Sequence, residues 1–70
     1  MRNIVIIGGS KGIGSAILVQ QLENNTVYNI SRSAPEISHR NLTHYPIDIL
    51  QDTLPEIKSI DVLIYCPGSI

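Results

Sequence analysis

The sequence predicts an α/β fold built on a doubly wound parallel sheet, and three observations lead to that prediction. Short β-branched apolar runs alternate with helical or polar segments, which is the order expected of parallel strands joined by crossovers. A glycine-rich segment, residues 8–14, links the first apolar run to the first helical pattern. The 70 residues contain three Tyr but no Phe or Trp. Ile, Leu and Val must therefore form the core, which suits a sheet buried on both faces.

The first half of the chain is predicted to form a strand, a helix and a second strand. Residues 2–7 are a β-branched apolar run typical of a buried strand. Residues 12–23 are predicted to be helical, because apolar residues recur there near helical spacing. These apolar residues are Ile13, Ala16, Ile17 and Leu22. Asn24 and Asn25 are a suitable stop, since Asn tolerates left-handed backbone. Residues 26–30 are predicted to be the second strand.

The second half is predicted to add two strands. Residues 31–41 are polar and read as a loop with room for one helical turn. Residues 42–47 are expected to form a short third strand, and residues 61–65 a fourth. A short helix is predicted over residues 52–60, with Pro55 tolerable only in its first turn. In a doubly wound sheet these four strands take the spatial order 3-2-1-4, and a ligand crevice lies at the carboxyl ends of strands 1 and 4.

Composition excludes several classes of function. The formal net charge is -1, and no basic patch suggests nucleic-acid binding. The longest wholly apolar run, residues 4–7, is too short to span a bilayer and leaves no room for a secretory signal. The single cysteine, Cys66, excludes an internal disulfide framework and a zinc cluster, so a reducing, cytoplasmic setting is expected. His39 and His44 are interpreted as surface or loop histidines, without a metal.

The glycine segment has the composition of a phosphate-binding turn. Gly8 and Gly9 permit positive φ and a tight turn. Gly12 and Gly14 lack a Cβ atom, so a pyrophosphate and the neighbouring strand can approach closely. The free N–H groups and positive dipole end at the helix start then face the anion. The alternative is a glycine-rich turn without a ligand. The candidate contacts in this segment are Gly8, Gly9, Ser10, Lys11, Gly12, Ile13 and Gly14.

Three motifs in this order resemble the short-chain dehydrogenase/reductase family, and the resemblance covers the whole chain. The family motif T-G-x-x-x-G-x-G matches residues 7–14 at all three glycines, with Ile7 in the place of Thr. The family's D-V-L-V-N-N-A-G aligns with residues 61–68, where the N-N-A-G element keeps only Gly68. Asp48-Ile49 occupies the place of an Asp-apolar pair. The resemblance implies a Rossmann-type sheet, three-layered (αβα) when complete.

The resemblance also assigns cofactor contacts beyond the glycine segment. Asp48 and Ile49 would meet the adenine, although Asp48 is equally suited to capping the helix predicted after it. Cys66, Pro67 and Gly68 lie where the family's backbone passes the nicotinamide ribose. Cys66 itself reads as a small buried side chain rather than a reactive thiol.

The end of the second predicted strand indicates which dinucleotide is bound. A carboxylate about 20 residues after the glycines would bind the 2′-OH of NAD, and no acid stands there. Arg32 offers a planar fork of donors suited to a 2′-phosphate, flanked by the hydroxyls of Ser31 and Ser33. With Lys11 in the turn, the resemblance implies NADP, and NAD is less favoured. The alternative is that Arg32 and Lys11 are ordinary solvated charges, and Glu36 is the one nearby acid that would argue for NAD.

The family's catalytic Ser and Tyr-x-x-x-Lys are missing from this chain, because no lysine stands four residues after any tyrosine. They are expected beyond Ile70. With one full helix the sheet would be poorly covered, so residues 1–70 are interpreted as the N-terminal part of a single NAD(P)-binding domain. The alternative is a self-standing small unit stabilised by a partner.

The function implied is reversible hydride transfer between NADP(H) and a small-molecule carbonyl or alcohol substrate. This chain would carry the adenine and pyrophosphate half of the site and no catalytic residue. A homo-oligomer, dimer or tetramer, is implied by the resemblance. A non-catalytic dinucleotide-binding or redox-sensing protein of the same fold is the main alternative. An epimerase or dehydratase of the extended branch fits the glycine spacing less well.

Overall fold

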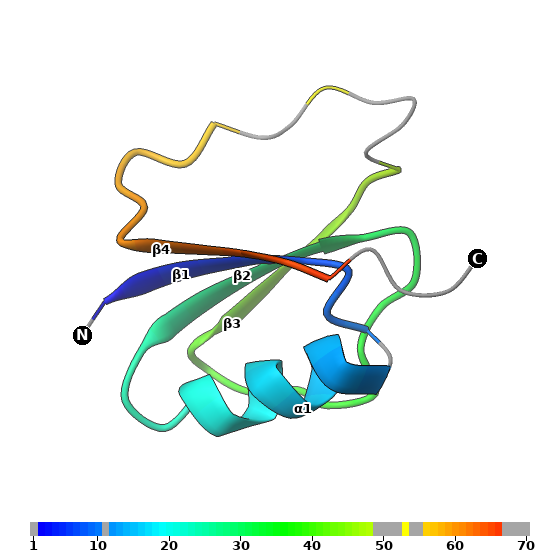
Figure 1. The fold of residues 1–70 in the computed structure, drawn as a ribbon, viewed down its shortest axis with the longest axis horizontal. Coiled ribbons are helices and arrows are strands. Elements are labelled where there is room, and N and C mark those ends of the chain that lie inside the picture. Colours follow the sequence, from blue (N-terminus) through cyan, green and yellow to red (C-terminus); the bar gives the residue numbers. More distant parts are fainter. Residues whose placement is uncertain (1, 11, 49–52, 54–55, 67–70) are drawn as a thin grey trace.

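The computed structural model describes residues 2–10, 12–48, 53 and 56–66. These residues form a four-stranded sheet with one helix packed on it (Figure 1). In chain order the elements are β1 (Asn3–Ile7), α1 (Gly12–Gln21), β2 (Thr26–Ser31), β3 (Leu42–Pro46) and β4 (Val62–Tyr65). All three strand pairs are parallel and the spatial order is β3-β2-β1-β4. The predicted α/β class and strand order are confirmed, and the arrangement is that of a Rossmann-like N-terminal portion.

The register places the carboxyl ends of three strands side by side. Ile7 at the end of β1 is level with Ile30 of β2 and with Tyr65 of β4. The direction of winding reverses between β1 and β4, since β1 is followed along the chain by β2 on one side and β4 returns on the other. The switch point of the strand order therefore lies where the sequence places its glycines, which is the position at which a ligand crevice was expected.

Helix α1 covers one face of the sheet. Its buried residues are Gly14 and Leu18, whereas Ile13 is 77% exposed and Ala16 is exposed. Of the four apolar residues at helical spacing, Ile17 and Leu22 do pack in the core on this face. Ile13 and Ala16 face away from it, because Gly14 approaches the turn closely and Leu18 follows one turn later. The core on this face consists of Ile4, Ile6, Leu18, Leu22 and Val27.

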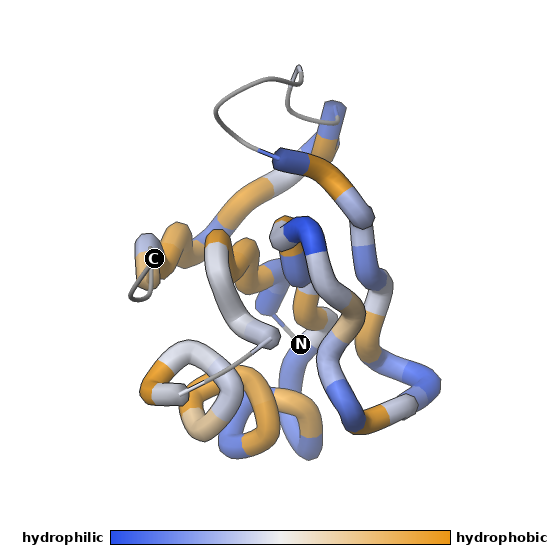
Figure 2. The backbone as a smooth tube through the Cα atoms, turned by 90° about the vertical axis from the view of Figure 1, so that its right-hand side faces the viewer, coloured by the Kyte–Doolittle hydropathy of each residue, from blue (hydrophilic) through white to orange (hydrophobic). Residues whose placement is uncertain are grey.

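The opposite face carries a second, smaller core. Val5, Ile7 and Ile30 are buried there, and partly buried side chains pack against them. Those side chains are Tyr28, Tyr45, Ile47 and Ile57. Helix α1 and the described residues 56–61 that precede β4 lie on opposite sides of the sheet, as two perpendicular views show (Figures 1 and 2).

The predicted helix over residues 52–60 is wrong for the residues that the structure describes. Thr53 and residues 56–60 have no helical structure. An isolated short helix is marginal in water and relies on tertiary packing of an apolar face. Here only Ile57 of the described segment packs against the core, and Ile60 is 49% exposed. The connection at residues 32–41 likewise contains no helical turn.

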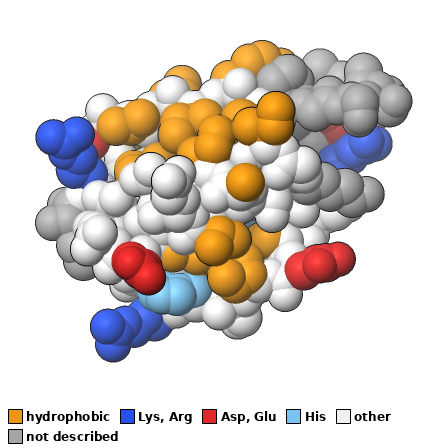
Figure 3. Space-filling model, turned by 60° about the horizontal axis from the view of Figure 1, so that its bottom comes forward, with side chains coloured by type: hydrophobic (Ala, Val, Ile, Leu, Met, Phe, Trp, Pro, Cys, Tyr) orange, Lys and Arg blue, Asp and Glu red, His pale blue; other side chains and the backbone are white. Residues whose placement is uncertain are grey.

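The surface on the α1 side mixes apolar and charged side chains. Figure 3 shows a row of apolar side chains across the upper part of this view, with the acidic and basic side chains toward its periphery. In the described part of the chain, no helix has the length and apolar character needed to cross a membrane.

Candidate functional site

The glycine turn joins β1 to α1 at the carboxyl edge of the sheet. Gly8 has φ = 86° and Gly12 has φ = 61°, the left-handed region that favours glycine. The Gly8 N–H donates to the carbonyl oxygen of Ile30 at 2.9 Å, so the turn starts hydrogen-bonded to the end of β2. The chain thus leaves β1 and enters α1 through two positions that only glycine adopts readily.

Gly9 and Gly14 are required for close packing instead. A Cβ atom on Gly14 would collide with the Gly8 carbonyl oxygen and lie 3.2 Å from the Cys66 Cβ. A Cβ on Gly9 would lie 2.5 Å from the Asn29 Oδ1 and 3.1 Å from the Leu18 Cδ1. The predicted positive φ at Gly9 is wrong, since crowding by β2 and α1 explains the glycine there. Protein atoms approach Gly14 closely, as expected, whereas a Cβ on Gly12 would meet no protein atom within 4 Å.

The start of α1 is open to an anion. Gly12 and Ile13 are exposed, and the first turn of the helix contains no acidic side chain that would compete for its N–H groups. The first N–H groups of a helix have no intrahelical partner and carry the positive end of the dipole. A phosphate group fits such a position.

The end of β2 brings a hydroxyl and a cation toward the same edge. Ser31 is partly buried, and its hydroxyl donates to the Ser33 carbonyl oxygen at 2.7 Å. Arg32 is exposed, and no described residue forms a hydrogen bond or ion pair with its guanidinium. The charge of Arg32 is therefore available to a ligand at this edge.

The end of β4 completes the edge. The Cys66 N–H donates to the Ile7 carbonyl oxygen at 2.8 Å, so the chain after β4 still follows β1. Cys66 is a partly buried free cysteine beside Gly14. Tyr65 is 61% exposed rather than packed, because it points to the face of β4 that no described helix covers.

Part of the predicted site cannot be placed. Lys11, Ile49, Pro67 and Gly68 lie outside the described residues. Asp48 is described and partly buried just after β3. The structure thus brings together the glycine turn, the end of β2 and Cys66, and it places Asp48 just after β3.

Sequence reasoning missed two residues, Asn29 and His44. Asn29 is 0% exposed in the middle of β2, and its Oδ1 accepts the Gly9 N–H at 2.8 Å. His44 lies in β3 rather than in a surface loop, and its Nδ1 is 3.1 Å from the Asn29 Nδ2. The sequence did contain a signal for Asn29. Asn29 lies two residues after Val27, so in a strand both side chains point to the same buried face, where an amide is unexpected.

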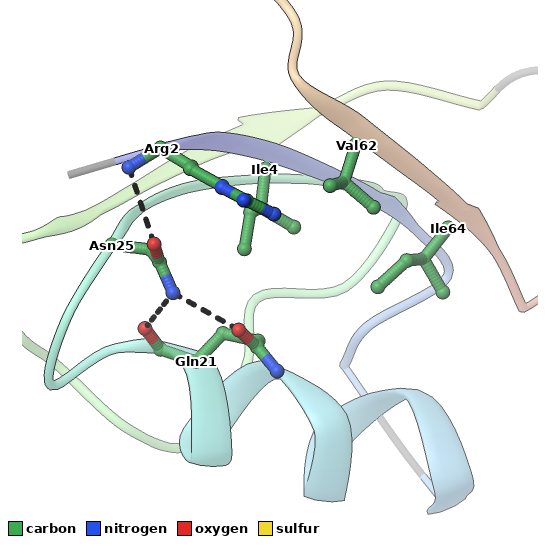
Figure 4. Close-up of a pocket in the computed structure, with 6 residues that line it drawn as sticks. All are labelled: Arg2, Ile4, Gln21, Asn25, Val62 and Ile64. Carbon is green, nitrogen blue, oxygen red and sulfur yellow. Dashed lines mark hydrogen bonds between the residues drawn. The ribbon is translucent and has the colours of Figure 1, made fainter.

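A cavity of about 350 Å³ lies elsewhere, between the start of β1, β4 and the end of α1 (Figure 4). Asn25 lines it, accepting the Arg2 N–H at 3.2 Å and donating to the Gln21 carbonyl oxygen at 3.3 Å. This cavity shares no residue with the glycine turn. Among the described residues, no cluster of three or more His, Cys, Asp or Glu is placed to hold a metal ion.

Comparison with known proteins gives one informative match. The chain is 41% identical over 51 residues to benzil reductase ((S)-benzoin forming) of Bacillus subtilis strain 168. The aligned part is 71% of this chain and 21% of the relative, so the match spans about a fifth of the relative's length. That relative is by its name a reductase, and this partial match supports at most a resemblance to the short-chain dehydrogenase/reductase family. No family model and no solved structure matches the chain.

Proposed function

We propose that this chain forms the adenine and pyrophosphate half of an NADP site in an oxidoreductase of the short-chain dehydrogenase/reductase family. The observation that carries the proposal is the glycine turn at the switch point of the 3-2-1-4 sheet, which opens into an acid-free helix start. Gly8 and Gly12 shape the turn, and Gly14 lets the helix sit against it. A pyrophosphate is the anion that such a turn accommodates in a dinucleotide-binding fold.

The preference for NADP over NAD rests on charge at the end of β2. Arg32 is exposed and unpaired among the described residues, and no carboxylate occupies the neighbouring positions Ser31 and Ser33. A guanidinium suits a 2′-phosphate, whereas NAD binding uses an acid to accept the 2′-OH. The Ser31 hydroxyl already donates to Ser33, so it would meet a ligand as an acceptor. Arg32 is therefore the residue on which the preference depends.

The reaction proposed is reversible hydride transfer between NADP(H) and a carbonyl or alcohol carbon. In the reducing direction the carbonyl carbon accepts hydride and its oxygen gains a proton, giving an alcohol. NADP(H) supplies the hydride chemistry when bound. The residues of this chain would bind and orient its adenosine side. Benzil, the compound in the relative's name, is the first substrate to assay.

Exchange of the charge at residue 32 tests the cofactor. We expect Arg32→Asp to weaken binding of NADPH by at least tenfold and of NADH much less, because an acid would then repel the 2′-phosphate. Arg40→Asp is the matched control: Arg40 is also exposed, but it lies before β3, at the other edge of the sheet. Equal losses for both cofactors in Arg32→Asp would overturn the NADP assignment.

A non-catalytic dinucleotide sensor of the same fold is the alternative. It is favoured by the sequence Tyr65-Cys66-Pro67, where the resembled family has Asn-Asn-Ala. NADPH oxidation in the presence of benzil or other carbonyl compounds separates the two. Turnover supports the enzyme, whereas tight binding of NADPH without turnover over a broad carbonyl panel supports the sensor.

A further inference from the structure

Asn29 is the only buried polar side chain in the described part of the chain, and it lies at the centre of a hydrogen-bond network. Its Oδ1 accepts the Gly9 N–H at 2.8 Å. Its Nδ2 lies 3.0 Å from the Ser31 Oγ and 3.1 Å from the His44 Nδ1. One amide therefore contacts the glycine turn, the carboxyl end of β2 and the neighbouring strand β3.

The orientation of this amide is determined by its partners. The Gly9 N–H is only a donor, so the amide oxygen must face it and the amide nitrogen must face the other two groups. The Ser31 Oγ and the His44 Nδ1 are then acceptors from Asn29.

Burial makes the network costly to break. Asn29 is 0% exposed, and the space around Gly9 that its oxygen enters is closed by the Ile6 and Leu18 side chains. A buried donor that loses its acceptor keeps the cost of its removal from water with no hydrogen bond to offset it. Without the Asn29 oxygen, the Gly9 N–H would have to move toward water, and the turn would have to change shape with it.

The network also determines what the site presents to a ligand. The Gly9 N–H already donates to the Asn29 Oδ1, so it cannot bind a ligand. An anion at the turn must instead bind the N–H groups that follow Gly9 toward the start of α1. The Ser31 hydroxyl accepts from Asn29 and donates to the Ser33 carbonyl oxygen, so it offers a lone pair rather than a proton. Both effects originate from one side chain.

We infer that Asn29 is a positioning residue of the dinucleotide site, which holds the glycine turn and the Ser31 hydroxyl in their ligand-binding arrangement without touching the ligand. The inference rests on the proposed function for the identity of the ligand. It assigns the coupling between the pyrophosphate end and the ribose end of the site to one buried amide in β2.

The test compares Asn29→Leu, Asn29→Asp and Val27→Ala in the full-length protein, with NADPH and 2′,5′-ADP as probes. Asn29→Leu removes the acceptor for Gly9, whereas Asn29→Asp keeps an oxygen there. Val27 is equally buried in the same strand but has no hydrogen bond to the turn, so Val27→Ala controls for lost stability. We expect Asn29→Leu to raise the Kd of both probes at least tenfold and Val27→Ala to leave both within about twofold. Asn29→Asp should fall between them, because it keeps the acceptor for Gly9 but loses the donations to Ser31 and His44.

Amide hydrogen exchange at Gly9 gives a readout that needs no ligand. We expect slow exchange in the wild type and in Asn29→Asp, and exchange at least tenfold faster in Asn29→Leu. A Gly9 amide that exchanges freely in the wild type would overturn the inference even if Asn29→Leu fails to fold. So would wild-type affinity in Asn29→Leu, or an equal loss of affinity in Val27→Ala. If the wild type binds neither probe, the proposed function fails, and with it the ligand role of Asn29. Slow Gly9 exchange in that case would show that Asn29 still holds the glycine turn, so the failure would lie in the proposed ligand and not in the hydrogen-bond network.

Discussion

Replacement of Gly14 by alanine should destabilise the protein, although the same change at an ordinary helix position stabilises it. In a helix interior, alanine is favoured over glycine by about 1 kcal/mol. At Gly14 the new Cβ would collide with the Gly8 carbonyl oxygen and lie 3.1 Å from the Gly9 Cα. Both are backbone atoms of a turn hydrogen-bonded to β2, so neither can move independently. Overpacking of this kind lowers the free energy of unfolding by about 1–3 kcal/mol. Because the crowded atoms belong to the backbone, we expect a loss in the upper half of that range.

Urea unfolding measures the effect directly. With a slope of about 1 kcal/mol per molar, the low end for a small protein, a loss of about 2 kcal/mol lowers the midpoint by about 2 M. Ala16→Gly is the matched control in the same helix, because Ala16 is exposed and its loss should cost only the propensity difference of about 1 kcal/mol. A Gly14→Ala variant as stable as the wild type, or more stable, would refute the reasoning that close packing requires this glycine.

Two further changes test the turn and the core. Gly12→Ala should lower the free energy of unfolding by about 1–2 kcal/mol through the left-handed φ alone, because the added Cβ meets nothing within 4 Å. Gly12→Asn should cost less, since Asn tolerates this backbone conformation better. Equal urea midpoints for the wild type and both variants would show that the left-handed φ does not require glycine. Leu18→Ala should lower stability by about 2–5 kcal/mol, because Leu18 is fully buried beneath the sheet. Val19→Ala on the exposed side of the same helix should stay within about 0.5 kcal/mol, and similar losses for both variants by thermal or urea unfolding would show that α1 packs through another face.

Local features of the sequence were sufficient to predict the order of the strands along the chain and the position of the glycine turn. The run ending at Ile7 is apolar throughout, so it is buried whichever way its pleat faces, and it is strand β1. The glycines after it require backbone that other residues avoid, and they mark the strand-to-helix junction. The order of elements then restricts the topology, because crossovers between parallel strands are right-handed. Those arguments use neighbouring residues only, which is why they could be made from the sequence.

Long-range packing decided what each glycine and each helix face does. Gly9 is crowded by Asn29, 20 positions later in the chain, and Gly14 by Cys66 after β4. Helical spacing included Ile17 and Leu22, which pack in the core, but also Ile13, which is 77% exposed. The contact at Gly14 sets the rotation of α1, so that Leu18 faces the sheet. The segment 56–60 had a helical pattern but, in the described structure, too little packing to form a helix.

The sequence by itself therefore determined the class of fold, the strand order and the edge of the sheet at which the glycine turn lies, since these follow from local backbone preferences and from the alternation of elements. Only the tertiary structure revealed that Asn29 links the glycine turn to Ser31 and His44. The physical reason is that a buried amide must satisfy all of its hydrogen bonds, and the partners that do so come from three separate segments that meet only when the sheet has formed.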